Sequence, residues 1–367
     1  MMLGGKSATE QAIEGAARQA IQVANNADIS NSNNTVILQN NVFNQVESDS
    51  EFEERVLEVF KNNYPQLSDR AREEALQRAQ KFIDIMLSVI HEEGGDLTGF
   101  DTPRILAATY DAQRTYAENA DDEQAKAMAR LLQKLARESP LTLKDVLIKQ
   151  ALQCLPMLAK THVNALGAIV YLTKMTLHTG SVDPVMESLD QSLGFYIGKV
   201  PSTSFDYEYM ESCNVGVTDL MISTPNPYER IFMTYPHIFH HDVLASNIPE
   251  NINKEALVDV LIPIEGETDR FRMSPDSCHK VIADRLNFSY QFNDDPAKDL
   301  LEKCRFSPVE IREVVDQHNP ELAKLLDILN QTGALRFKVN AVGHVIGLES
   351  WKSAGGMTRI TIDDLIE

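Results

Sequence analysis

Amphipathic segments separated by Pro, Gly and Ser breaks run through residues 51–200, and they constrain the fold more than any other feature. In the first segment apolar residues such as Phe52 and Val56 recur four positions apart, which places them on one side of an α-helix. Ser68 is a predicted N-cap for the next segment, and Gly94 lies where that segment ends. Helices of this kind, joined by short connections, predict a multi-helix array with antiparallel neighbours.

The C-terminal third carries further helix signals, followed by one strand signal. Asn319-Pro320 begins a predicted helix rich in Leu, because Pro fits the first helical turn. Residues 335–339 alternate between apolar and polar side chains as a strand does, and Asn340 is a predicted cap for a short helix after it. We therefore expect a mainly α protein whose residues 271–367 form a winged-helix-like α+β unit.

Residues 25–44 differ sharply in composition from the rest of the chain, with eight Asn among them. Asn disfavours helix and tolerates turns, while the short apolar runs of this segment favour β-strands. Strands this short do not form a stable sheet in one copy, but copies from several chains could pair and stack their Asn side chains. The segment is thus either a β-type oligomerisation element or a disordered polar linker. The apolar residues that would carry the oligomerisation are Ile29, Val36, Ile37, Leu38, Val42 and Phe43.

These patterns divide the chain into four predicted parts. Residues 1–48 would form a leader helix and the Asn-rich β oligomerisation segment, and residues 49–200 the helical domain. Residues 201–270 would be an irregular, aromatic-rich connection, and residues 271–367 the winged-helix-like domain. The predicted fold class is therefore a mainly α multi-helix array with a β segment at one end and an α+β unit at the other.

The charge balance of the chain disfavours some classes of partner. Lys and Arg number 34 against 54 Asp and Glu, which gives a formal net charge of -20. Nucleic acid and anionic membranes need a basic face, so bulk binding to either is disfavoured. The most apolar run, residues 163–177, is too short to span a bilayer and contains Asn164 and Lys174. Because no secretory signal pattern is visible either, we expect a cytoplasmic protein without a membrane span.

Cysteine and histidine offer only weak candidates for a catalytic site. The four Cys lie tens of residues apart with no CxxC pair, so neither a zinc site nor a disulfide framework is predicted. Cys213 has no nearby basic residue that would lower the pKa of its thiol. His237, His240 and His241 form the densest His group, but no second cluster with ligand-like spacing accompanies them. We expect no metal and no cofactor, and we keep these four residues as weak catalytic candidates.

Several stretches of the chain resemble a functionally unassigned bacterial family of helical proteins. They are FKNNYP at residues 60–65, NNTVILQNN at 33–41, AQRTYAENADDEQAKAMARLLQKLARE at 112–138, YMESC at 209–213, and the pattern LxFxxNxVGxxIG at 335–347. The family shares an Asn/Gly-rich N-terminal segment, and the helix predicted for residues 121–137 is similar to helices of abortive-infection-type proteins. The resemblance covers most of residues 25–350. It implies a prokaryotic cytoplasmic protein in a phage-defence or mobile-element setting, and it carries no catalytic residue with it.

The function that these expectations favour is a non-enzymatic, homo-oligomeric helical protein that acts as a sensor or scaffold in anti-phage defence. Its partners would be other copies of itself and another defence or phage protein. One alternative is an effector enzyme, of hydrolase or nuclease type, with a site near Cys213 and His237. A second alternative is a transcriptional regulator acting through the C-terminal unit. Arg336, Lys338 and Lys352 form only a sparse basic set there, which favours a protein contact over DNA reading.

Overall fold

The computed structural model describes residues 48–64, 68–219, 226–248, 257–286, 296–356 and 360–366. The predicted leader helix and the Asn-rich segment lie outside these ranges. The same is true of every residue assigned above to oligomerisation, namely Ile29, Val36, Ile37, Leu38, Val42 and Phe43.

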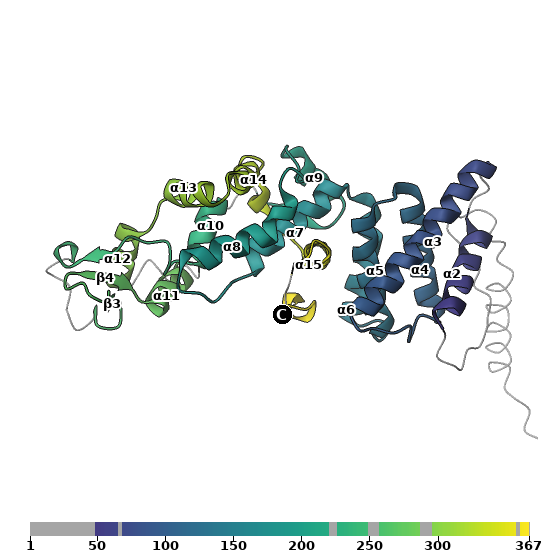
Figure 1. The fold of residues 1–367 in the computed structure, drawn as a ribbon, viewed down its shortest axis with the longest axis horizontal. Coiled ribbons are helices and arrows are strands. Elements are labelled where there is room, and N and C mark those ends of the chain that lie inside the picture. Colours follow the sequence, from purple (N-terminus) through teal and green to yellow (C-terminus); the bar gives the residue numbers. More distant parts are fainter. Residues whose placement is uncertain are drawn as a thin grey trace, which may run out of the picture.

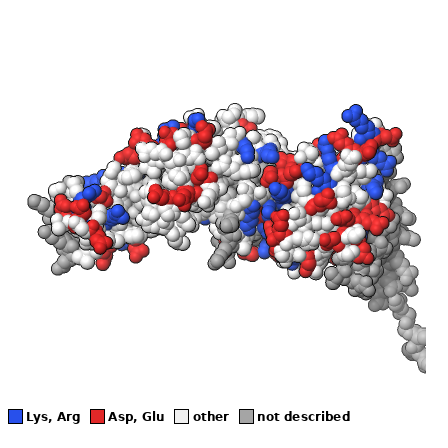
Figure 2. All heavy atoms as spheres, in the orientation of Figure 1, with Lys and Arg blue, Asp and Glu red and all other residues white. Residues whose placement is uncertain are grey.

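The described chain is mainly α-helical, as the amphipathic segments predict, and it is elongated (Figure 1). Its first helices are α2 (Asp49–Asn63), α3 (Asp69–Glu92), α4 (Pro103–Asn119), α5 (Asp122–Arg137), α6 (Leu143–Cys154), α7 (Lys160–Lys174) and α8 (Val182–Leu193). Helices α2–α6 pack at one end of the molecule, and α7 and α8 run through its middle (Figure 1). On the face shown in Figure 2, the α2–α6 end is densely covered by both acidic and basic side chains, while the middle is largely uncharged.

The N-terminal helices form where local signals place them. Phe52 and Val56 on α2 are buried as predicted, and the Phe52 ring meets the Phe100 ring edge-on with centroids 5.6 Å apart. Helix α3 begins directly after Ser68, although the Ser68 side chain makes no capping hydrogen bond. The helix ends before Gly94, whose φ of +64° is the left-handed conformation that glycine tolerates.

The second half of the described chain mixes shorter helices with short strands. They are α9 (Phe205–Ser212), β1 (Gly216–Thr218), α10 (Pro227–Thr234), β2 (Val243–Leu244), β3 (Leu261–Pro263), β4 (Arg270–Met273), α11 (Pro275–Leu286), α12 (Pro296–Cys304), α13 (Pro308–His318), α14 (Pro320–Gln331), β5 (Phe337–Val339), α15 (Ala341–Ser353) and α16 (Asp363–Ile366). Strands β2, β4 and β3 form one antiparallel sheet, in that order. This sheet lies with α11 and α12 at the end of the molecule opposite α2 (Figure 1).

Helix α15 lies in the centre of the molecule, between α5 and α7 (Figure 1). Its N-cap is Asn340, as predicted, and the Asn340 side chain accepts a hydrogen bond from the Gly343 amide. Glycine allows close packing here, because a Cβ on Gly347 would lie 2.6 Å from the Leu166 carbonyl oxygen of α7. Valine, isoleucine, leucine and Trp351 are buried along the helix, so it is apolar on several sides.

The winged-helix-like unit predicted for residues 271–367 is not confirmed. Strand β5 pairs antiparallel with β1, a strand outside that range, with Gly216 opposite Val339. Helix α15, which follows β5, packs chiefly on α7 and also contacts α5 and α6. One apolar cluster extends from Phe52 to Ile362, so the predicted helical and C-terminal parts share a core. Within the described residues, no helix is both long and apolar enough to cross a membrane.

Candidate functional site: an aromatic pocket

Cys213 and His237, two of the sequence-derived candidates, lie against different segments of the chain. Cys213 follows α9, and its buried Sγ is 3.9 Å from the Met157 carbonyl oxygen. His237 follows α10, and its Nε2 donates to the Thr179 carbonyl oxygen at 2.9 Å. The His237 ring also contacts the His279 ring, with centroids 5.0 Å apart. The two side chains thus have separate partners.

The side chains of the neighbouring residues His240 and His241 also differ in burial and in hydrogen-bond partners. His240 is buried, its Nδ1–H donates to the His241 carbonyl oxygen at 2.9 Å, and burial lowers the pKa of its imidazole. His241 is exposed, and its Nε2 is 2.9 Å from the carboxylate of Glu310. Among the described residues, no three His, Cys, Asp or Glu side chains are grouped so as to hold a metal ion.

A cavity of about 650 Å³ lies where α7, α8, Tyr235 and the end of α15 meet. Three aromatic side chains line it, those of Tyr171, Tyr235 and Trp351. Polar groups come from hydroxyl, amide and imidazole side chains, and its described lining contains no Asp, Glu, Lys or Arg. Cavities of this size, mostly apolar with a few polar groups, are the usual form of small-molecule sites. We call this cavity the aromatic pocket.

Two tyrosine hydroxyls of the aromatic pocket are held by hydrogen bonds. The Tyr171 hydroxyl is 2.9 Å from Ser188 Oγ, and the Tyr235 hydroxyl accepts from the Leu177 amide at 3.0 Å. Burial raises the pKa of both phenols above its ordinary value. The Tyr171 ring also lies against the Trp351 ring, with centroids 5.6 Å apart and planes at 45°. The two phenols are therefore held in place and neutral at physiological pH.

Trp351 provides the one clear anomaly of the pocket wall. Its side chain is 4% exposed, and its indole N–H has no hydrogen-bond partner in the part of the chain that the structure describes. A buried donor left unpaired costs about 1–3 kcal/mol. Gly356 lies against the indole, since a Cβ there would be 2.7 Å from Nε1, and Gly355 has a φ of +96°. Both positions therefore need glycine.

The segment between α7 and α8 forms one wall of the pocket, and the end of α10 holds it at two points. Helix α7 ends at Lys174 because Met175 is extended, with a ψ of 137°. Tyr235 then bonds the Leu177 amide, and His237 bonds the Thr179 carbonyl. His237, which the sequence marks as a catalytic candidate, thus supports the pocket wall from outside.

A second cavity, of about 410 Å³, lies between α4 and α6 and contains charged groups. Arg104 and Lys149 both pair with the fully buried carboxylate of Asp145, and Arg114 pairs with Asp111 at 3.6 Å. Arg104 also donates to main-chain carbonyls at the end of α5. These charges join α4, α5 and α6, so the cavity is less suited to a ligand than the aromatic pocket.

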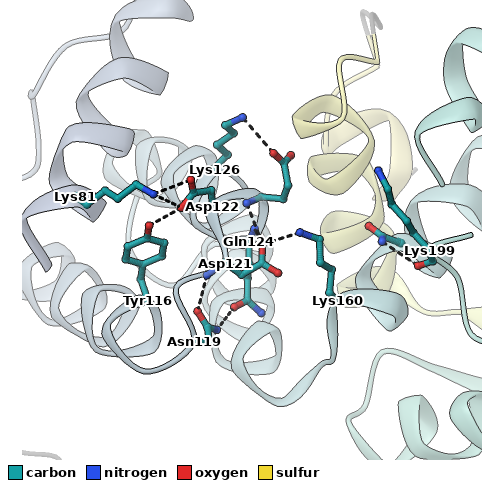
Figure 3. A network of polar contacts seen from close by, with 11 residues as sticks. Lys81, Tyr116, Asn119, Asp121, Asp122, Gln124, Lys126, Lys160 and Lys199 are labelled. Carbon is teal, nitrogen blue, oxygen red and sulfur yellow. Dashed lines mark hydrogen bonds and ion pairs between the residues drawn. The ribbon is translucent and has the colours of Figure 1, made fainter. Parts of the chain in front are cut away.

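Like the charged groups of the second cavity, the polar network at the start of α5 joins helices to one another (Figure 3). Asp121 caps the helix by accepting from the amides of Glu123 and Gln124. Asp122 accepts from the Tyr116 hydroxyl and from Lys81, whose Nζ is 2.8 Å away, and these contacts lower the pKa of its carboxyl. The contacts of Asp121 and Asp122 in Figure 3 therefore connect α5 to α3 and α4 and, through Lys160, to α7.

Trp351, Tyr171 and Tyr235 are the residues that sequence reasoning missed. They come from separate helices and loops, and no local spacing connects them. One signal was available, because Trp351 is the single tryptophan of the chain and sits in a predicted apolar helix. A buried indole N–H is normally hydrogen-bonded. A tryptophan in a predicted buried helix therefore indicates that its N–H binds either another group of the protein or a ligand.

Comparisons with known proteins give one match. No curated protein and no solved structure matches the chain. A protein-family model that carries only the description ":-like" matches residues 48–363, and that description names no activity. Neither finding bears on abortive infection or phage defence, so that part of the resemblance stays a prediction. Because the match covers most of its length, the chain belongs to this uncharacterised family.

Proposed function

We propose that this protein is a non-enzymatic sensor that binds a small molecule in the aromatic pocket. The observation that carries the proposal is that the described residues lining a cavity of about 650 Å³ include no Asp, Glu, Lys or Arg, in a chain of which 24% is charged. Three aromatic side chains in such a lining favour binding of a largely apolar ligand with a few polar groups. The two tyrosine hydroxyls, fixed by Ser188 and Leu177, supply a wall that is shaped before a ligand arrives.

The position of Trp351 supports a sensor over a passive scaffold. Trp351 lies on α15, and this helix packs against α5, α6 and α7. A ligand that displaces Trp351 or the glycines after it acts directly on a helix shared by both halves of the molecule. A ligand that binds α15 more tightly in one packing arrangement than in another would shift the population toward the arrangement that it binds better.

Ligand binding in the aromatic pocket has more support than catalysis at Cys213 and His237, the candidates named from the sequence. An effector enzyme using Cys213 and His237 needs the two side chains within hydrogen-bond reach. Their contacts instead join Cys213 to Met157 and His237 to Thr179. The enzyme alternative therefore draws no support from this geometry.

Assembly and setting complete the proposal and rest on the sequence. In it, the Asn-rich segment of residues 25–44 joins copies of the chain, which makes the sensor a homo-oligomer. The setting is defence against phage, as the resemblance to abortive-infection-type helices implies. Binding of a ligand would then change the behaviour of the whole assembly.

A thermal-shift screen with bacterial metabolites tests the proposal on the full chain. Gln191→Phe places a ring on the exposed lining of the pocket, and Glu187→Phe places the same ring on an exposed position of α8 outside it. We expect at least one compound to raise the Tm of the natural protein and of Glu187→Phe, but not of Gln191→Phe, because only bound ligand stabilises the fold. The proposal fails if no compound shifts the Tm, or if Gln191→Phe responds like the natural protein.

A further inference from the structure

We infer that the aromatic pocket takes an uncharged, planar ring compound that carries a carbonyl oxygen, such as a heteroaromatic amide or lactam. The inference rests on the proposed function and names the ligand class of the same site. Three features of the pocket carry it: its charge, its aromatic walls and the unpaired indole donor.

The charge of the pocket selects against ions. Its described lining contains no Asp, Glu, Lys or Arg, so a cation would find no carboxylate there and an anion would find only the His178 imidazole to replace its hydration. The phenols of Tyr171 and Tyr235 remain neutral because burial raises their pKa. A neutral compound loses far less on leaving water, so the pocket favours it.

The walls of the pocket select a planar ring. Tyr171 and Trp351 hold their rings 5.6 Å apart between centroids at 45°, and Tyr235 adds a third ring to the lining. Aromatic faces bind other rings in offset or edge-to-face arrangements, with additional stabilisation beyond simple burial. The hydroxyls of the two tyrosines are already engaged, which keeps these rings in place for the ligand.

The indole N–H of Trp351 selects an acceptor on the ligand. The group is buried, has no partner among the described residues, and belongs to a side chain that lines the pocket. Gly356 lies against it, so a ligand oxygen would reach the N–H only by displacing Gly355 and Gly356. Glycine resists such a backbone change least of all residues. A carbonyl oxygen of the ligand would then satisfy a donor that has no partner among the described residues.

Nicotinamide, nicotinate and 1-methylnicotinamide test the inference, because they place a neutral, a negative and a positive group on one ring. Trp351 is the single tryptophan, so its fluorescence in the full chain reports on the pocket itself. We expect nicotinamide to change this fluorescence saturably, at a concentration at least about tenfold below either charged analogue. The change should be absent in Gln191→Phe.

Calorimetry on two variants tests the donor. Trp351→Phe keeps an aromatic ring and removes the N–H, so the affinity for nicotinamide should fall about fivefold to tenfold. Tyr209→Phe is the control outside the pocket, since it removes a hydroxyl that donates to the Met157 carbonyl oxygen, and it should leave the affinity unchanged.

The outcomes separate this inference from the proposed function. Equal or tighter binding of a charged analogue overturns the ligand class while the pocket remains a binding site. An unchanged affinity in Trp351→Phe overturns the carbonyl anchor. Failure of all three probes overturns the ligand class, and the metabolite screen with Gln191→Phe then decides the proposed function by itself.

Discussion

At the scale of single residues, His344 shows how the fold controls ionisation. This imidazole lies on α15, and burial, aided by the nearby charge of Lys174, lowers its pKa from 6.5 to about 4. The unfolded chain therefore binds a proton at His344 at a higher pH than the folded chain does. Burial also lowers the pKa of the His240 and His279 imidazoles.

Because the unfolded chain takes up this proton at a higher pH than the folded chain, we expect the folded protein to lose stability in mild acid. The contribution of His344 is fully present above pH 6.5 and disappears as the pH falls toward about 4. Because His344 is partly exposed, we expect the loss to be about 1–2 kcal/mol after solvent screening. Urea unfolding across this pH range measures it, and His344→Gln should flatten the curve in part, since His240 and His279 remain. A His344→Gln curve as steep as that of the natural protein would contradict the assignment.

Hydrogen bonds of individual residues also explain which local predictions hold. Asn340 caps α15 as predicted because its side chain bonds the Gly343 amide three residues later. Ser68 occupies its predicted cap position without making the bond. A capping residue in the sequence indicates where a helix starts, but the neighbouring backbone determines which amide N–H groups its side chain binds.

At the scale of elements, the packing of α15 on α7 depends on glycine. A Cβ at Gly347 would lie 2.6 Å from the Leu166 carbonyl oxygen, which is main chain and has little freedom to move. Gly347→Ala should therefore lower the free energy of unfolding by about 1–3 kcal/mol. Gly180→Ala is the control, because a Cβ there meets nothing within 4 Å. Chemical denaturation compares the two, and equal stabilities would show that α7 and α15 can separate freely.

An ion pair joins α15 to α5. Glu349 on α15 is fully buried, and its carboxylate accepts from Lys134, which is only partly exposed. Lys134→Met leaves a buried carboxylate without its main partner, so we expect a loss of about 3 kcal/mol. Lys134→Arg keeps a cation and should lose less. In a double-mutant cycle, Lys134→Met with Glu349→Met should recover part of the loss, and purely additive losses would count against the pair.

At the scale of the whole molecule, the central position of α15 ties the two ends of the chain together. The helix is among the last elements of the sequence, yet it contacts α5, α6 and α7, and one apolar cluster includes residues from Phe52 to Ile362. The aromatic pocket lies at this junction, because Tyr171 comes from α7 and Trp351 from α15. A ligand in the pocket therefore touches the packing that holds the molecule together.

Assembly is the other property of the whole molecule, and the sequence predicts where it resides. Deleting residues 1–47 removes the Asn-rich segment and keeps Ser48, which forms a capping box with Glu51 at the start of α2. We expect the truncated chain to fold and to have a smaller oligomer mass by light scattering, because pairing of Asn-rich strands is lost. Substituting the same length by a Gly/Ser linker is the control for chain length. An unchanged mass would refute assembly through this segment.

The sequence by itself determined the helical character of this protein, whereas the tertiary structure decided the pocket and the place of α15. Helix signals act over about four residues, so amphipathic spacing, Pro at helix starts and the Asn340 cap are readable locally. The three aromatic residues of the pocket lie far apart in the sequence at 171, 235 and 351, and they meet only because α15 packs on α7. The strand before α15 likewise found its partner in β1 by long-range packing, which is why the expected C-terminal unit is not confirmed. Local spacing fixes how a segment folds, but the burial of apolar surface between distant segments determines which side chains share a site.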